Sequence, residues 1–131
     1  MIGLDTNVLV RYLTLDDPVQ AEQATEIIER RLTEQDPGFV SVVAMAEMVW
    51  VLERFYRFSS ARIVAAIKRM LGAETVVVES EREVFAAMIA LDEGHGSFAD
   101  ALIGALSAKA GCSRVLTFDR KALRLPGFEL P

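Results

Sequence analysis

The chain has 131 residues, of which 52% are apolar, so it can bury the core of one domain, and we expect a single domain over residues 1–131. Its 14 basic and 19 acidic residues give a net charge of -5, which excludes the strongly basic domains that attract nucleic acid through their overall charge. The sequence has neither an apolar run of roughly 18 residues nor a signal-peptide pattern, so we expect a cytoplasmic protein without a membrane partner.

The first part of the chain alternates between an apolar segment and amphipathic ones. Residues 1–4 are apolar and are followed by Asp5, which predicts a short buried strand, and residues 7–13 are expected to turn helical behind it. Two aspartates precede Pro18, and an acidic cap followed by proline is typical of a helix start. We therefore expect a helix from Pro18 to about residue 32.

The next part repeats the alternation of strand and helix. The sequence DPG at residues 36–38 breaks the chain, and residues 39–43 are apolar and β-branched, which predicts a second strand. Apolar residues at spacings of three and four then predict a helix; they are Met45, Met48, Val49 and Leu52. Another helix is expected to follow Ser59 and Ser60 and to stop at Gly72.

A third strand is predicted at residues 75–78, and Ser80 is expected to begin the next helix. The sequence GHGS at residues 94–97 ends that helix. A further helix is expected at residues 98–111.

The last predicted strand covers residues 114–118. The only cysteine, Cys112, cannot form an internal disulfide, and we expect it to be a small buried side chain. Strands that are apolar on both faces and separated by helices indicate a parallel sheet covered on both sides. The expected fold class is therefore α/β, a three-layer α/β/α sandwich with a central, mainly parallel sheet.

Four acidic residues are expected near one rim of this sheet. Asp5 and Asp119 follow predicted strands, and Glu47 and Asp100 lie in the first turns of helices that follow strands or loops. Ligands of open parallel sheets bind in the crevice beyond the carboxyl ends of the strands. An exposed turn explains Asp5 equally well when it is considered alone.

The apolar context of these acids favours a shared site. Glu47 lies between Ala46 and Met48, and Asp100 lies between two alanines, so both are expected to be buried. Burying like charges together is costly without a partner, and no Lys or His lies near them in sequence. Divalent cations would neutralise such a cluster, and ligand sets made only of oxygen suit Mg²⁺ or Mn²⁺ better than zinc.

Four motifs of this chain follow the order that they have in the PIN-domain ribonucleases. The chain resembles that family, and most closely the toxins of bacterial VapBC toxin–antitoxin pairs. The motifs are LDTNVLV at residues 4–10, Glu47, FADAL at residues 98–102 and TFDR at residues 117–120. The resemblance runs from residue 1 to about residue 125. It implies a magnesium-dependent endoribonuclease that hydrolyses phosphodiester bonds of transfer RNA or another structured RNA. It also implies a homodimer and a cognate VapB-like antitoxin that inhibits the enzyme.

The resemblance also implies roles for individual residues. Asp5 and Asp100 match the principal metal ligands of the family, and Glu47 and Asp119 complete its acidic quartet. Other matching or neighbouring positions support the site; they are Thr6, Asn7, Ser97 and Thr117. Many members of the family carry an acid where this chain has Ser97, which we interpret instead as a helix N-cap with Asp100 three residues later.

Other functions remain open at this stage. A receiver-like signalling domain also binds Mg²⁺ at strand ends, but it needs an Asp after a central strand, where this chain has Glu79, and a Lys after a late strand. A haloacid-type phosphatase needs a second acid two residues after its nucleophile, where this chain has Asn7. A binding module without catalytic activity leaves the acids unexplained.

Two further features concern partners. Basic residues near the expected rim are candidates for contacts with an RNA backbone; they are Arg11, Arg120 and Lys121. The apolar residues around Trp50 are candidates for either a core or a partner groove; the others are Met45, Met48, Phe55 and Tyr56. A mean hydropathy of +0.29 is high for a small monomer, which favours a dimer.

Overall fold

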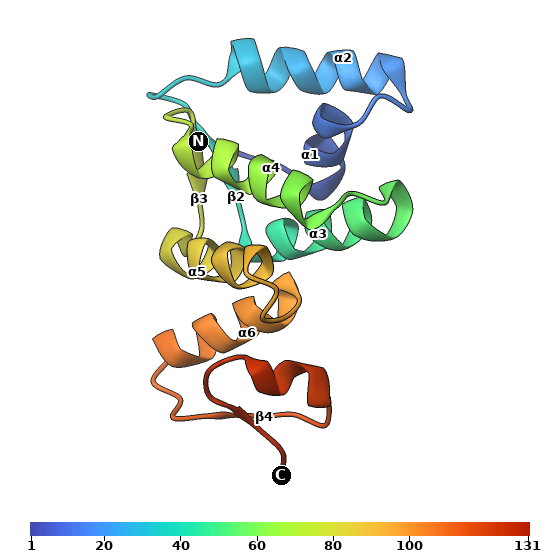
Figure 1. Ribbon diagram of the computed structural model, residues 1–131. Helices are drawn as coiled ribbons and strands as arrows, with labels where there is room; N and C mark the ends of the chain where they lie inside the picture. Colours follow the sequence, from blue (N-terminus) through green and yellow to red (C-terminus); the bar gives the residue numbers. More distant parts are fainter. The chain divides into compact units, whose positions relative to one another are not determined.

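The computed structural model describes residues 1–131, which form two compact units, Met1–Glu79 and Ser80–Pro131. Figure 1 shows the order of the helices and strands along the chain. None of the helices is both long and apolar enough to cross a membrane.

The first unit contains a three-stranded parallel sheet with the order β1-β2-β3. The strands are β1 (Ile2–Gly3), β2 (Gly38–Val40) and β3 (Val76–Val78). These three strands confirm the predicted ones in position, but the second ends earlier than expected. Residues 41–43 do not continue β2, because Ser41 caps the next helix and its hydroxyl accepts a hydrogen bond from Ala44 N–H at 3.1 Å.

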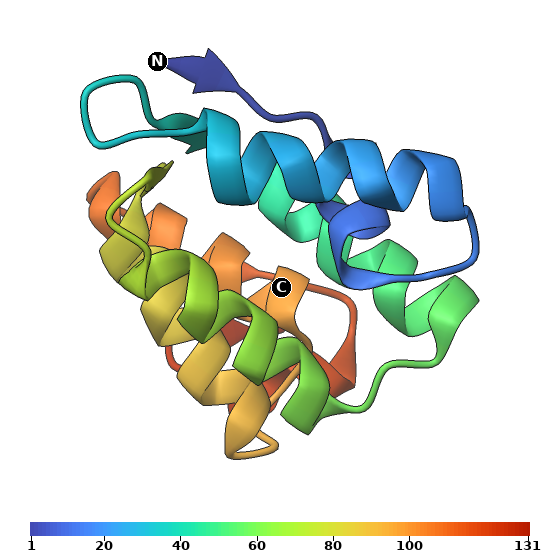
Figure 2. The same cartoon turned by 90° about the horizontal axis from the view of Figure 1, so that it is seen from above.

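The helix after β1 is α1 (Thr6–Leu13), and it is followed by α2 (Pro18–Glu26). Asp17 caps α2 as predicted, since its carboxylate accepts a hydrogen bond from Gln20 N–H at 3.1 Å. The expected helix through residue 32 is present, but its last turn is a π-helix over Ile27–Arg31. Helix α1 contacts both α2 and α3 (Val42–Tyr56), as the view in Figure 2 helps to follow.

The core of the first unit is built from the predicted apolar stripes. On α3, the side chains of Met45, Met48 and Leu52 are fully buried. Helix α4 (Ser60–Gly72) begins at the predicted serines and buries its own stripe of apolar residues. Its buried residues are Ile63, Val64, Ala66 and Ile67.

The second unit packs α5 (Glu81–Asp92) against α6 (Phe98–Lys109). Its two strands, β4 (Val115–Leu116) and β5 (Phe128–Glu129), pair in parallel. Between them lies a short 3-10 helix, Arg120–Arg124. Neither β5 nor the 3-10 helix was predicted, because both are too short to show a periodic pattern.

Two residues show how the second unit closes. A Cβ atom at Gly104 of α6 would lie 2.7 Å from Cε2 of Phe128, so only glycine leaves room for the phenyl ring of β5. The prediction that Cys112 is buried was wrong, because Cys112 is exposed. It follows Gly111, whose positive φ of 97° turns the chain away at the end of α6.

The burial of one face of α3 can be tested by substitution. Leu52→Ala removes a side chain that has no exposed surface, so it should lower the free energy of unfolding by about 2–5 kcal/mol. Urea denaturation followed by circular dichroism measures this change. Arg54→Ala, at an exposed position of the same helix, should change stability by less than about 0.5 kcal/mol. Equal losses for the two variants would contradict the assigned helix face.

Candidate functional site

Two of the predicted acids line one hollow in the first unit. Asp5 lies at the junction of β1 and α1, and Glu47 projects from α3. Because α1 contacts α3, the two carboxylates share a hollow of about 250 Å³. We call it the first hollow; its other lining residues are Thr6, Asn7, Val10, Arg11, Val51 and Tyr56.

Asp5 is held by the start of the helix that follows it. Its backbone is extended, and its carboxylate accepts a hydrogen bond from Thr6 N–H at 2.8 Å. Thr6 itself is buried, so the donor that orients Asp5 is fixed by packing. A carboxylate at a helix N-terminus also lies at the positive end of the helix dipole.

The other two predicted acids line a hollow in the second unit. Asp100 lies in the first turn of α6, and Asp119 follows β4. They share a hollow of about 710 Å³, which we call the second hollow. Its other lining residues are Gly94, His95, Gly96, Ser97, Arg120, Lys121 and Arg124.

Ser97 is the N-cap of α6, as predicted. Its hydroxyl accepts a hydrogen bond from Asp100 N–H at 3.1 Å. The reciprocal bond of a capping box, from Ser97 N–H to the Asp100 carboxylate, is not formed. The half-buried Asp100 side chain is therefore free to interact with a ligand in the second hollow.

Asp119 is held in a tight turn. Its N–H donates to the Thr117 hydroxyl at 3.0 Å, and its carboxylate accepts from Lys121 N–H at 2.9 Å. Thr117 is tied in turn to β5, because its N–H donates to the carbonyl of Glu129 at 3.0 Å. The hydroxyl of Thr117 thus supports the backbone that carries Asp119.

The prediction that apolar sequence neighbours bury these acids was wrong. Asp5, Glu47 and Asp119 are exposed, and only Asp100 is half-buried. On a helix, residues one or two positions apart point in different directions. Glu47 therefore emerges beside the stripe formed by Met45 and the rest of the buried face.

The carboxylate oxygens of each hollow suit a hard cation, but they are too few to hold it without other ligands. Within neither unit do three or more His, Cys, Asp or Glu side chains lie together in a way that could hold a metal ion. Each hollow instead supplies two carboxylates and no sulfur ligand. Mg²⁺ is commonly bound through one or two carboxylates, with water and substrate phosphates completing its shell.

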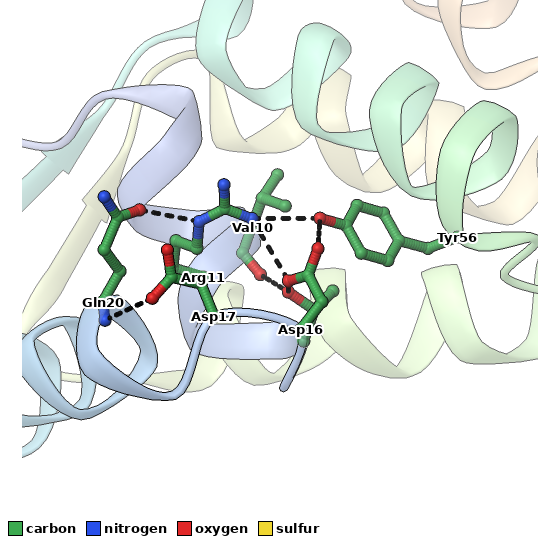
Figure 3. Close-up of polar contacts among 7 residues, drawn as sticks. Val10, Arg11, Asp16, Asp17, Gln20 and Tyr56 are labelled. Carbon is green, nitrogen blue, oxygen red and sulfur yellow. Dashed lines mark hydrogen bonds and ion pairs between the residues drawn. The ribbon is translucent and has the colours of Figure 1, made fainter.

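Two residues that line the first hollow, Arg11 and Tyr56, belong to a polar network, which Figure 3 shows. Arg11 Nη1 donates to the Tyr56 hydroxyl at 3.0 Å and to Asp16 Oδ1 at 3.2 Å. The Tyr56 hydroxyl donates to Asp16 Oδ2 at 2.6 Å, and Arg11 Nε donates to Gln20 Oε1 at 2.8 Å. This set, which we call the Arg11 network, joins α1, the loop after it, α2 and the end of α3.

The network changes the ionisation of its members. The hydrogen bond from Tyr56 lowers the pKa of Asp16, and bonds from Thr14 and the charge of Arg11 act in the same direction against the effect of burial. The contact with Tyr56 and the charge of Asp16 raise the pKa of Arg11 above its usual value. Both charges are therefore stabilised by each other and by the same hydroxyl.

Sequence reasoning missed two parts of these hollows. Tyr56 was considered only as an apolar partner residue, because nothing local connects it to Arg11, 45 positions earlier. Arg124 was not among the residues named for RNA contact, although it follows Lys121 by three residues and both lie on the 3-10 helix. Because the 3-10 helix was not predicted, the spacing of three residues did not indicate that Lys121 and Arg124 lie near each other.

The chain is similar to known proteins over most of its length. The family profile of the PIN domain matches residues 2–127. The chain is also 26% identical to a VapC ribonuclease of Aquifex aeolicus (strain VF5) over 126 residues, which is 96% of this chain and 92% of that protein. These matches confirm the resemblance seen in the sequence and, with it, the expected α/β/α fold class.

The Arg11 network predicts a pH-dependent effect of Tyr56→Phe. The stabilisation from Asp16 is fully present above its ordinary pKa of 3.8 and is lost as the pH falls through its lowered pKa. Tyr56→Phe should therefore be less stable than the wild type at about pH 7, and the difference should shrink at about pH 2. Urea unfolding at both pH values measures it. In an Asp16→Asn background the difference should not change with pH; the same pH dependence in that background would contradict the assignment.

Proposed function

Because this chain belongs to the PIN-domain family, we propose that it is a metal-dependent endoribonuclease, the toxin of a type II toxin–antitoxin pair. The observation that carries the proposal is the family match over residues 2–127, which includes all four acids and residues of both units. The similarity to a VapC ribonuclease supports the same class. The receiver-like alternative gains no support. The carboxylate of Glu79 accepts a hydrogen bond from Val42 N–H at 2.8 Å, so it joins β3 to α3.

The proposed catalytic residues are Asp5, Glu47, Asp100 and Asp119. Each is proposed as a ligand of Mg²⁺, for which Mn²⁺ is a substitute with the same preference for oxygen. When bound, the cation activates the attacking water and stabilises the leaving oxygen of the phosphodiester. The carboxylates contribute orientation, because hydrogen bonds hold Asp5 and Asp119 before any ligand arrives.

Supporting residues act through the backbone. Thr6 N–H orients the Asp5 carboxylate, the Ser97 hydroxyl caps the helix that carries Asp100, and Thr117 holds the turn of Asp119. Asn7 lines the first hollow beside Asp5. A catalytic site depends on such hydrogen bonds around its reactive side chains to keep its geometry.

The proposed substrate is transfer RNA or another structured RNA, cleaved in the cytoplasm. The net charge of -5 disfavours RNA overall, so local basic groups must attract the backbone. Arg120, Lys121 and Arg124 lie in the second hollow together with its two carboxylates. A volume of about 710 Å³ lies within the usual range of small-ligand pockets.

We also propose that the protein forms a homodimer and binds a VapB-like antitoxin. The apolar residues around Trp50 divide into two groups, since Met45 and Met48 are core residues. Trp50 and Phe55 are exposed and contact each other edge to face, with ring centroids 5.6 Å apart. Exposed apolar patches of this kind often mark protein interfaces.

Cleavage of total RNA tests the nuclease proposal. Asp5→Asn, Glu47→Gln, Asp100→Asn and Asp119→Asn should each reduce Mg²⁺-dependent cleavage by at least about a hundredfold, because each removes a ligand charge. EDTA should abolish cleavage, and Mn²⁺ should restore it. Calorimetric titration with Mn²⁺ should show weaker binding to the same variants.

The control for these variants is Glu22→Gln. Glu22 is an exposed acid of α2 that lines neither hollow, so its loss changes the net charge by the same amount without touching the proposed ligands. It should leave both cleavage and Mn²⁺ affinity unchanged. Cleavage that survives both Asp5→Asn and EDTA would reject the mechanism.

Light scattering tests the dimer. At micromolar concentration the measured mass should be twice the 14.4 kDa of one chain. The reason is that a domain of this size with exposed aromatic residues gains stability by burying them against a second copy. A mass of 14.4 kDa at all micromolar concentrations would contradict the proposed dimer.

A further inference from the structure

We propose that Arg11 binds a phosphate of the RNA at the first hollow and that Asp16 and Tyr56 are positioning residues that hold Arg11 there. The inference rests on the proposed RNA substrate and extends it, because it assigns a phosphate contact to the unit that carries Asp5 and Glu47. Its basis is the shared lining of the first hollow and the bonding pattern of the guanidinium.

Arg11 and Tyr56 both line the hollow that contains the two carboxylates. The Arg11 side chain is 28% exposed, so it remains partly accessible from the solvent. A phosphate that approached Asp5 and Glu47 in this hollow would meet a cation beside them. That cation offsets the repulsion between the phosphate and the carboxylates.

The bonding of the guanidinium leaves one of its three nitrogens free. Nε donates to Gln20, and Nη1 donates to both Tyr56 and Asp16. Nη2 takes part in none of these bonds. Its two N–H groups are therefore available to a phosphate oxygen, which is a strong acceptor for arginine.

The two bonded nitrogens fix the position of the free one. Arg11 would otherwise keep several rotatable bonds, and ordering them on binding costs affinity. Three partners from three segments remove that freedom in advance: Gln20 from α2, Asp16 from the loop before it, and Tyr56 from the end of α3. Gln20 is itself held, because its N–H donates to Asp17.

A contribution to stability alone explains the Arg11 network less well than a role in positioning Arg11 does. The exposed pair of Arg11 and Asp16 by itself would contribute little to stability. Here the tyrosine hydroxyl bridges both charges, donating to Asp16 at 2.6 Å while accepting from Arg11 at 3.0 Å. Such a bridge fixes one geometry of the guanidinium, which a phosphate site needs and a surface ion pair does not.

The test measures binding of bulk transfer RNA in EDTA, where metal-dependent cleavage cannot proceed, at about 50 to 200 mM salt. Arg11→Gln should weaken binding by about tenfold and reduce the slope of log affinity against log salt by about 0.7 to 0.9, the effect of one lost phosphate contact. Arg11→Lys should recover the slope but only part of the affinity, because lysine keeps the charge but cannot form the hydrogen bonds of the Arg11 network.

Two variants separate positioning from folding. Tyr56→Phe should keep the salt slope, because the charge of Arg11 remains, and should weaken binding by about threefold through lost positioning. Leu52→Ala lowers stability without altering the lining of the first hollow, so below its melting temperature it should bind RNA like the wild type.

The matched charge control is Arg30→Gln. Arg30 forms an exposed ion pair with Glu26 and lines neither hollow, so its loss should leave the slope unchanged. The double variant Arg11→Gln with Asp16→Asn keeps the network neutral and should remain as weak as Arg11→Gln. Recovery in the double variant would mean that the uncovered charge of Asp16, and not a lost phosphate contact, weakened binding.

The inference is overturned if Arg11→Gln and the wild type have the same affinity and the same salt slope. It is also overturned if Leu52→Ala reproduces the binding loss. Because binding is measured without metal, a wild type that binds RNA but fails to cleave it with Mg²⁺ would reject the nuclease proposal and leave this inference standing.

Discussion

The packing of α1 on α3 is the constraint on which the first hollow depends. Asp5 enters the hollow because β1 must end in a helix whose first N–H groups need an acceptor. Glu47 enters from 42 positions later in the sequence only because α3 lies against α1. The apolar stripe of α3 makes that contact obligatory, since its burial excludes Met45, Met48 and Leu52 from water. The packing of the core therefore also brings the carboxylates of Asp5 and Glu47 into the same hollow.

The second unit reaches a similar result with shorter elements. A helix cap holds Asp100, and a turn tied to β5 holds Asp119. In each unit a hydrogen bond from the backbone orients one carboxylate, that of Asp5 or that of Asp119, without a ligand. The two hollows differ in their cations, because the second is lined by three basic residues and the first only by Arg11.

The charge balance of the protein agrees with this arrangement. A chain with a net charge of -5 binds a polyanion only where fixed cations or bound metal ions reverse the local potential. The exposed position of three of the four acids lowers the cost of keeping them charged, since water still reaches them. The burial of these acids therefore does not create a need for metal ions. In the proposed mechanism the metal ions would serve catalysis, because a phosphodiester anion must approach carboxylates of the same sign.

Local sequence signals determined the positions of the first four strands and most helix boundaries, because caps, prolines and apolar spacing act over a few residues. The serine caps at Ser59 and Ser97 and the acidic cap before Pro18 illustrate this. The family motifs are local in the same sense, and they identified the PIN domain. Only the tertiary structure decided that Glu47 is exposed, that Cys112 is exposed and that Tyr56 meets Arg11. Those outcomes depend on which helix faces meet, and contacts between residues far apart in the chain leave no periodic trace in the sequence.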